Sequence, residues 1–154
     1  MIDERHFFSI DVSEEFDLNK RFSLCQCLEV AEHIKEENSD ILVRNLCIHS
    51  DIVFFSAASV GQGGENHVNE KPYSYWKNKF QSHGYDMFDP IRSRLVKHNG
   101  VEVWYKNNIF IFIKKGTKYS DILSTFKVDS DHDIKAVSYT HLRAHESCVH
   151  RVCG

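Results

Sequence analysis

The sequence contains no long apolar run and no cluster of basic residues. Apolar runs such as residues 109–113 have the length of a strand, so no membrane-spanning helix is predicted. The first residues, MIDERHFF, contain no basic region followed by an apolar stretch, so a signal peptide is not expected. The formal net charge is −3 over 154 residues, and no run of Lys or Arg indicates a partner with a nucleic-acid backbone. These absences favour one globular domain that is neither membrane-bound nor a nucleic-acid binder.

Cysteine occurs five times, at irregular spacing and without an export signal, which indicates reduced thiols and a cytoplasmic location. Cys25 and Cys27 are two positions apart in a strand-like segment, so both side chains point to one face of the strand. We interpret this pair as packing residues rather than as metal or redox groups.

The segment around which the chain is organised is FSLCQCLEVAEH, at residues 22–33. Residues 22–28 form a short apolar run typical of a strand buried on both faces, and the run ends at Glu29. A helical pattern follows, with Ile41, Leu42, Asn45, Leu46 and Ile48 on roughly one face. A buried strand, a polar turn and a helix predict an α/β fold with a ligand crevice at the carboxyl end of the strand.

Three segments, in this order, resemble class I S-adenosylmethionine-dependent methyltransferases. The first is LEVAEHI at residues 28–34, which is similar to the E-x-x-E-H-hydrophobe run that many members carry after strand 4. The second is DIVFFSAA at residues 51–58 with the glycine-rich loop 61–70, and the third is YSYWKNKFQSHG at residues 73–84. The resemblance covers about residues 7–114. It implies a truncated Rossmann-like α/β sheet with helices on its faces and an antiparallel last strand, and methyl transfer from S-adenosylmethionine to a small-molecule acceptor.

The same resemblance implies which residues bind the cofactor. A strand at residues 7–10 would be strand 3 of the family, and Asp11 after it would hydrogen-bond the adenine amino group. An ordinary turn aspartate is the alternative. Cys27, Leu28 and Glu29, at the end of strand 4, would also contact the cofactor. Glu29 would lie against its methionine portion or the acceptor, although a carboxylate that caps the next helix fits the same position.

Catalysis is assigned to His33 and Glu29. His33 is the candidate general base, because an unperturbed histidine titrates near neutrality, whereas a structural histidine with one hydrogen bond is the alternative. The loop after strand 5 faces the acceptor pocket in this family. Its candidate substrate-binding residues are Gln62, His67 and Asn69, with turn-forming polar residues as the alternative.

The remaining pattern predicts helices over residues 34–49 and 73–83, and strands over 51–58, 85–91, 101–105 and 109–114. Asn38, Ser39 and Asp40 prefer caps to helix interiors, so they break the first helix or begin a second piece. Glu32 is interpreted as an exposed charge at the start of this helix. Gly84 is the expected end of the second helix.

The glycine-rich turn and the ribose-binding acid of the family have no counterpart, because the six residues before Phe7 cannot hold the elements that carry them and no G-x-G-x-G occurs in the chain. We therefore expect the C-terminal part of a longer gene product, which alone binds S-adenosylmethionine very weakly or not at all. The loss of neighbouring strands exposes an edge of strand 4, so self-association is expected. The alternative to an enzyme is a non-catalytic fragment or interaction module that another chain completes.

Residues 118–154 are predicted to be a linker and a largely disordered tail outside a partial methyltransferase domain of residues 1–117. Residues 135–146, KAVSYTHLRAHE, resemble the translation of a sequencing-library adapter, so about residues 136–154 are interpreted as never selected to fold. The tail places potential zinc ligands at short spacings, namely His141, His145, Cys148, His150 and Cys153. Without a core beside them to orient their partners, we expect no metal site.

Overall fold

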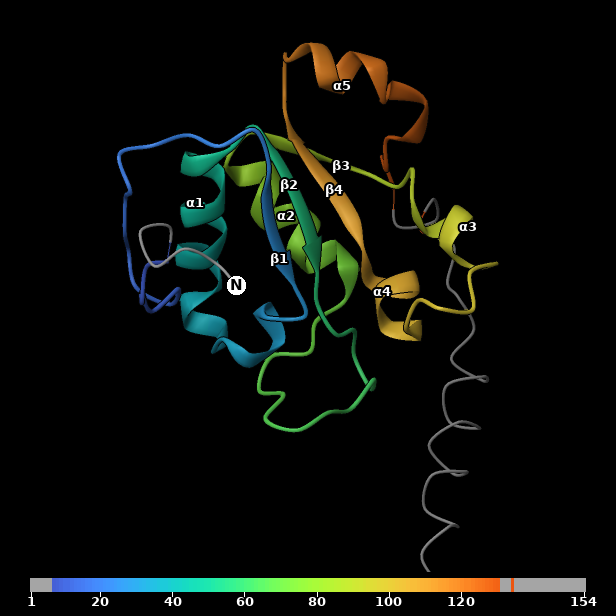
Figure 1. Cartoon of the computed structure of the whole chain (residues 1–154), viewed down its shortest axis with the longest axis horizontal. Helices are drawn as coiled ribbons and strands as arrows, with labels where there is room; N and C mark the ends of the chain where they lie inside the picture. Colours follow the sequence, from blue (N-terminus) through green and yellow to red (C-terminus); the bar gives the residue numbers. More distant parts are fainter. Residues whose placement is uncertain (1–6, 131–133, 135–154) are drawn as a thin grey trace, which may run out of the picture.

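The computed structural model describes residues 7–130 and residue 134. Its sheet has the strand order β1-β2-β4-β3 (Figure 1). The bounds are Cys25–Leu28 for β1, Ile52–Ser56 for β2, Tyr85–Phe88 for β3 and Phe110–Lys114 for β4. β1 and β2 are parallel, whereas β4 is antiparallel to both of its neighbours, β2 and β3. The prediction of an α/β fold with an antiparallel last strand is therefore confirmed.

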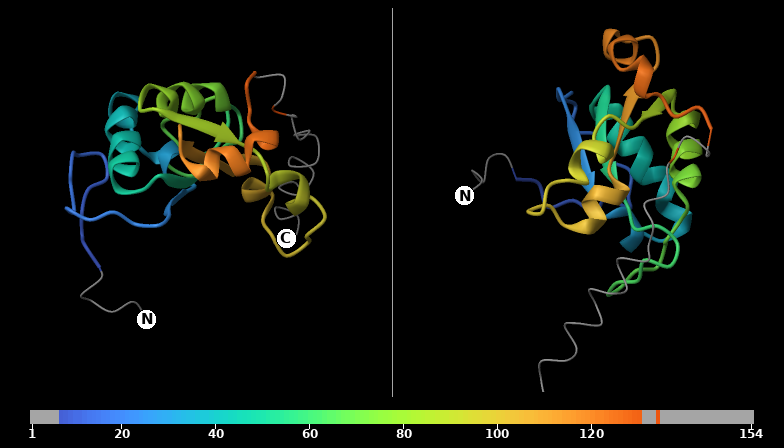
Figure 2. Two further views of the ribbon diagram at one scale, coloured as in Figure 1. Left: turned by 90° about the horizontal axis from the view of Figure 1, so that it is seen from above. Right: turned by 90° about the vertical axis from the view of Figure 1, so that its right-hand side faces the viewer.

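One face of the sheet packs against α1 (Ser39–His49) and α2 (Tyr73–Ser82), as the view along the sheet shows (Figure 2). Aromatic rings fill the centre of this layer. Phe80 stacks on Phe112 with 3.8 Å between ring centroids, and Phe55 contacts both rings at 5.2 and 5.8 Å. These rings are at most 2 % exposed, so this layer is the main hydrophobic core. α2 ends as expected, with Gly84 in the left-handed region at φ 82°.

The opposite face has a smaller cluster of Phe88, Ile111 and Ile113, against which Leu123 packs. Leu123 follows α5 (Lys118–Ile122) and precedes η4 (Ser124–Phe126), two short turns of helix after β4. The chain then returns to the sheet, because the Val128 N–H donates to the Met87 carbonyl at 2.9 Å. Val128 is 3 % exposed, so residues after 117 contribute to the core; the domain boundary at 117 itself stays a prediction.

The strand predicted at residues 101–105 is wrong, because this segment leads into α4 (Val103–Asn108). The outer edge of β3 is already occupied by residues 126–128, through the Asp89 N–H to the Phe126 carbonyl and the bond from Val128. A strand at residues 101–105 therefore has no partner there, and its alternating pattern is overridden. The short helix α3 (Arg92–Leu95) lies between β3 and α4.

The strand predicted at residues 7–10 is also wrong, because these residues adopt no strand and are exposed. The chain instead crosses the outside of α1, where the Leu18 N–H donates to His49 Nε2 at 2.9 Å. Within the described ranges, β1 pairs only with β2, so its other edge has no strand beside it. Residues 7–24 form no strand that could cover that edge.

Other element boundaries also differ from the prediction, as the first strand and the first helix show. The strand at residues 22–28 narrows to β1, with an isolated bridge between Phe22 and Ser50 ahead of it. The helix at residues 34–49 is shorter, because η3 (Glu36–Asn38) precedes α1, which begins at Ser39. The predicted break at Asn38–Asp40 is thus confirmed. The His and Cys cluster of the tail, residues 141–153, lies outside the described residues, and in the described ranges no helix has the length and apolarity to cross a bilayer.

Candidate functional site

The carboxyl ends of β1 and β2 and the start of β4 meet at one edge of the sheet, beside the loop of residues 57–72 (Figure 1). Leu28 is opposite Ser56, and Phe55 is opposite Phe110, so all three strands reach this edge together. Glu29 follows β1 with φ 53°, a left-handed conformation that costs a residue with a side chain about 1 kcal/mol. Its N–H donates to the Ser56 carbonyl and hydroxyl, both at 3.0 Å, which stabilises this turn.

Glu32 is not an exposed charge, as the sequence indicated, but is 1 % exposed. It lies in the 3₁₀ turn η2 (Ala31–His33), and its carbonyl accepts hydrogen bonds from the N–H groups of Val68 and Asn69. Its carboxylate oxygen Oε2 is buried without a hydrogen-bond partner. Burial raises the pKa of this carboxyl, and the nearby charge of Glu29 raises it further. A buried carboxylate with a free oxygen is costly unless it is protonated, paired with a positive charge or bound to a cation.

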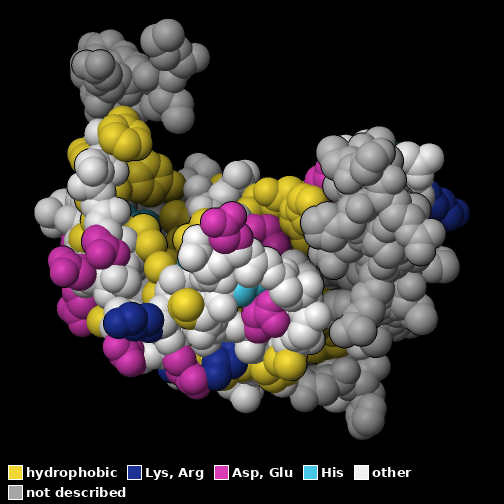
Figure 3. All heavy atoms as spheres, turned by 90° about the horizontal axis from the view of Figure 1, so that it is seen from below, with side chains coloured by type: hydrophobic (Ala, Val, Ile, Leu, Met, Phe, Trp, Pro, Cys, Tyr) yellow, Lys and Arg dark blue, Asp and Glu magenta, His cyan; other side chains and the backbone are white. Residues whose placement is uncertain are grey.

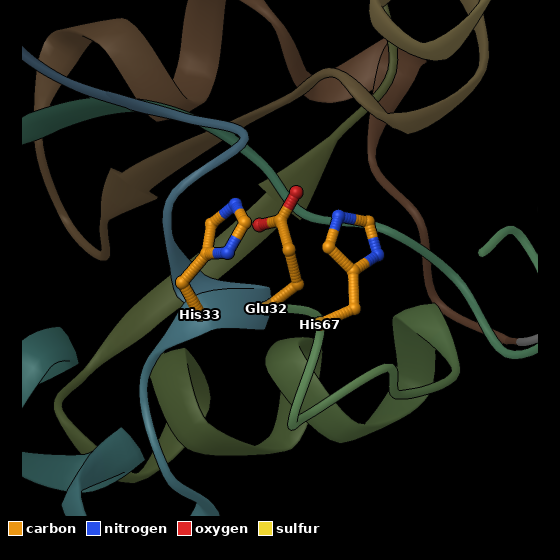
Figure 4. A group of neighbouring side chains, drawn as sticks. All are labelled: Glu32, His33 and His67. Atoms are coloured by element: carbon orange, nitrogen blue, oxygen red, sulfur yellow. The ribbon is translucent and has the colours of Figure 1, made fainter. Parts of the chain in front are cut away.

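His33 and His67 flank the Glu32 carboxylate (Figure 4), and their ring centroids are 5.0 Å apart in an edge-to-face arrangement. The Nδ1 atom of His33 lies 3.2 Å from the Asn66 carbonyl, and Nδ1 of His67 lies 2.9 Å from a Glu70 oxygen. Both partners only accept hydrogen bonds, so each neutral ring carries its proton on Nδ1 and has a lone pair on Nε2. One ligand atom from each of Glu32, His33 and His67 lies within 4.8 Å of the others.

The loop of residues 57–72 is folded around the Glu70 carboxylate. Its two oxygens accept the N–H groups of Gly61 and Gly63 at 2.8 and 2.7 Å, besides the bond from His67. Burial opposes its ionisation, but these three hydrogen bonds hold the pKa of Glu70 below its ordinary value. Glu70 therefore fixes the tautomer and the orientation of His67, as carboxylates do behind histidine ligands of metals.

Gly64 packs against the His67 ring near its Nε2 atom. A Cβ atom at residue 64 would lie 2.3 Å from Nε2 of His67, which is far inside van der Waals contact. The absence of a side chain at this position thus permits the observed place of the imidazole.

Glu29 borders this cluster through a hydrogen-bond network. The Asn108 Nδ2 atom lies 3.3 and 3.4 Å from the two Glu29 carboxylate oxygens and 2.9 Å from Gln62 Oε1. Gln62 Nε2 in turn lies 3.5 Å from Glu29 Oε2. Of the residues assigned to the acceptor pocket, Gln62 and His67 are therefore brought to the same edge as Glu29 and His33.

Asn69 is buried and holds the loop of residues 57–72 against α1. It is 2 % exposed, and its Nδ2 atom donates to the Ser39 hydroxyl at 2.9 Å. This bond ties the loop to the first residue of α1. Its assignment to substrate binding stays a prediction.

The residues assigned to the cofactor are not gathered in the same way. The Asp11 carboxylate accepts hydrogen bonds from the N–H and hydroxyl of Ser13, which hold its pKa below the ordinary value in an exposed turn. Val12 beside it contacts Asn45 of α1 rather than the strand ends. Cys27 is buried, and burial raises the pKa of its thiol to about 12. Of the residues assigned to S-adenosylmethionine in the described ranges, Leu28 and Glu29 remain at the strand ends and could contact one side of it. The residues present therefore do not fit the whole cofactor.

On the face of the molecule seen in Figure 3, acidic side chains lie next to a histidine side chain that is partly visible at the surface. A carboxylate and two histidines are a common ligand set for divalent cations such as Mn²⁺, Co²⁺ or Zn²⁺. The arrangement can therefore bind a cation at the strand ends, where ligands bind in open α/β sheets.

Sequence reasoning missed three residues of this site, namely Glu32, Glu70 and Asn108. The signal for Glu32 was present in E-x-x-E-H, because a short turn brings the second Glu and the His to one place. Glu70 is three residues after His67, a spacing that allows contact in a tight loop. Nothing in the sequence indicated that Asn108 reaches Glu29, since 79 positions separate them.

No protein-family model matches the sequence, and no curated protein matches it. Among solved structures, the chain is similar to the small RNA methyltransferase HEN1, with 15 % sequence identity and a TM-score of 0.46. The match covers 68 % of this chain and 15 % of that chain. Likeness at this level does not show a shared function, and the site stands on its own contacts.

Proposed function

We propose that this chain carries a divalent-cation site and forms the acceptor side of an S-adenosylmethionine-dependent methyltransferase. Glu32, His33 and His67 are the proposed ligands, and Glu29 lies beside them as a further carboxylate. The observation that carries the proposal is the unpartnered Oε2 atom of Glu32, buried between two histidines. A cation supplies the positive charge that this carboxylate otherwise lacks.

The methyl-transfer part of the proposal is supported by the sheet. The resemblance implied a last strand that is antiparallel, and β4 is antiparallel and inserted between β2 and β3. The proposed site lies at the carboxyl ends of β1 and β2, where the resemblance implied the cofactor and the acceptor to meet. The glycine-rich turn is absent from the sequence, so we expect the chain alone to bind S-adenosylmethionine very weakly or not at all.

At this site a cation held by Glu32, His33 and His67 would polarise an acceptor oxygen and lower the pKa of its proton. This chemistry favours a hydroxyl acceptor, and it changes the role proposed for His33. With Nε2 as a ligand, this imidazole holds the cation instead of acting as a free base. The small-molecule nature of the acceptor stays a prediction.

The test is a Mn²⁺ titration of the full chain, followed by electron paramagnetic resonance and calorimetry. We expect one equivalent to bind to the wild type, and its affinity to fall at least tenfold in Glu32→Gln and in His67→Ala. His98→Ala removes an exposed histidine outside the site and is the matched control, which should bind as the wild type does.

Because the tail contains further histidines, the titration is repeated with the double variant His141→Ala, His145→Ala. Unchanged binding there shows that His141 and His145 do not hold the cation. Equal Mn²⁺ affinity in the wild type and Glu32→Gln would overturn the proposal.

The interaction module remains the second candidate, because in the described part of the chain the outer edge of β1 has no partner strand. Two exposed apolar side chains precede β1 in the sequence, namely Phe22 at 39 % and Leu24 at 37 % exposure. An unpaired edge with apolar neighbours favours pairing with another chain.

A further inference from the structure

Asn108 connects the proposed cation site to the core. It is the last residue of α4, two positions before β4, and it is 1 % exposed. Its Nδ2 atom faces the Glu29 carboxylate and Gln62, and its Oδ1 atom accepts the hydroxyl of Tyr73 at 2.9 Å. Both the NH₂ group and the oxygen of the Asn108 side chain therefore form hydrogen bonds.

The direction of this amide is determined by its partners. An ionised carboxylate only accepts hydrogen bonds, so the NH₂ group must face Glu29 and the oxygen must face Tyr73. Rotation of the amide by 180° would place its oxygen against the Glu29 carboxylate. The Tyr73 hydroxyl stabilises the observed orientation, because it donates to the oxygen.

Tyr73 is itself held by its surroundings. It begins α2, and its ring lies edge-to-face on Phe110 with 5.1 Å between centroids. The Arg92 guanidinium carbon lies 5.6 Å from the Tyr73 ring centroid and 4.3 Å from that of Phe110. The Tyr73 hydroxyl is therefore a fixed donor on a rigid ring.

We propose that Asn108 is a positioning residue that holds the Glu29 carboxylate beside the cation, and that the Tyr73 hydroxyl sets the direction of Asn108. This inference rests on the proposed cation site. Neither residue contacts the cation, and both act through Glu29. Partners behind metal ligands change affinity about 10- to 100-fold when they are removed.

Tyr73→Phe is the test substitution, because it keeps the ring and its packing while removing one hydroxyl. Tyr75→Phe is the matched control on the same helix, since in the described ranges the Tyr75 hydroxyl has no hydrogen-bond partner. Affinity for Co²⁺ is measured by titration into the full chain. We expect the affinity of Tyr73→Phe to fall about tenfold, and that of Tyr75→Phe to equal the wild type.

The absorption spectrum of bound Co²⁺ supplies a readout that a loss of stability does not change, because it depends on the number and geometry of the ligands. At saturating Co²⁺, the spectrum of Tyr73→Phe should shift from that of the wild type toward that of Glu29→Gln. If the wild type binds no Co²⁺, the proposed function fails. If the wild type binds but Tyr73→Phe keeps the wild-type affinity or spectrum, the positioning role is overturned while the cation site stands.

Discussion

Glu70 Oε1 lies 2.9 Å from Nδ1 of His67, and the same carboxylate accepts two backbone N–H groups from residues 61 and 63. One side chain thus determines both the path of the loop and the direction of the imidazole. A site on a flexible glycine-rich loop needs such an anchor, since loops otherwise place side chains less exactly than strands do.

Glu70 makes the order of this loop dependent on pH. Its pKa in the folded chain is below the ordinary value of 4.5, so its stabilisation is fully present above pH 4.5 and is lost as the pH falls through the folded pKa. Hydrogen exchange at the Gly61 and Gly63 amides should therefore lose protection as the pH falls from 4.5 through the folded pKa of Glu70, after correction for intrinsic rates. Glu70→Gln should show reduced protection already at pH 7. Equal protection of the two chains at pH 7 would contradict this prediction.

Glu32→Gln should stabilise the fold while it weakens cation binding. A buried carboxylate without a partner costs stability, and the amide of Gln donates to the lone pairs on the histidine Nε2 atoms. We expect the free energy of unfolding without metal to rise by about 1 kcal/mol at pH 7, measured by urea denaturation. Because the folded pKa of Glu32 is raised, the cost of its ionisation disappears toward acid pH. The difference between the variants should therefore shrink as the pH falls, and a difference that grows would contradict the argument.

Gly64→Ala should displace the His67 ring. The added Cβ would lie 2.3 Å from Nε2, so the imidazole must move away from the observed place. We expect Mn²⁺ affinity to fall at least tenfold with little loss of stability, since residue 64 is exposed in a loop. Gly100→Ala is the control, because a Cβ there has nothing within 4 Å. Equal Mn²⁺ affinities of Gly64→Ala and Gly100→Ala would contradict this prediction.

Arg92→Lys should destabilise the chain. Arg92 is 3 % exposed, donates to Asp89 through Nε and Nη2 and to the Asn107 carbonyl through Nη1, and lies over Phe110. Lys cannot reproduce this planar set of donors, so we expect a loss of roughly 2–3 kcal/mol in the free energy of unfolding. Chemical denaturation measures it. The exposed Arg94→Lys is the control and should change stability by less than about 0.5 kcal/mol.

The outer edge of β1, which pairs with no strand of the described part of the chain, should produce self-association. Light scattering after size-exclusion chromatography should give a mass above 18.0 kDa that increases with concentration. Leu24→Lys places a charge beside this edge and should shift the equilibrium toward the monomer. A monomeric wild type at all concentrations would rule out this association.

The parts of the fold that were predicted correctly are those that local pattern determines. The apolar runs at residues 25–28, 52–56 and 110–114 formed strands, and Gly84 ended α2. The segment at residues 101–105 failed, because the place that a strand needs is taken by residues 126–128, far along the chain. The segment at residues 7–10 failed because, among the described residues, no strand lies beside it to pair with. Pairing partners are tertiary facts that periodicity cannot contain.

The site divides in the same way. His33 and His67 were identified by residue type and by their place after strands, and they meet at one edge. Glu32 was assigned to the surface because charged residues usually lie there, and its burial became visible only with the loop that covers it. Asp11 was assigned to the cofactor through a strand that does not form; its carboxylate accepts a hydrogen bond from the Ser13 hydroxyl, and its cofactor assignment stays a prediction.

Because β4 is antiparallel to β2, its first residues, and not its last, lie at the edge where β1 and β2 end. The amide of Asn108, two residues before β4, is therefore placed at this edge. Because side chains alternate along a strand, a slip of β4 by two residues would keep every core side chain on its own face of the sheet. The same slip would carry Asn108 about 7 Å away from Glu29. The alignment that buries Phe110 and Phe112 is thus also the one in which a helix-ending asparagine meets a turn glutamate, so the register of one strand serves the core and the site together.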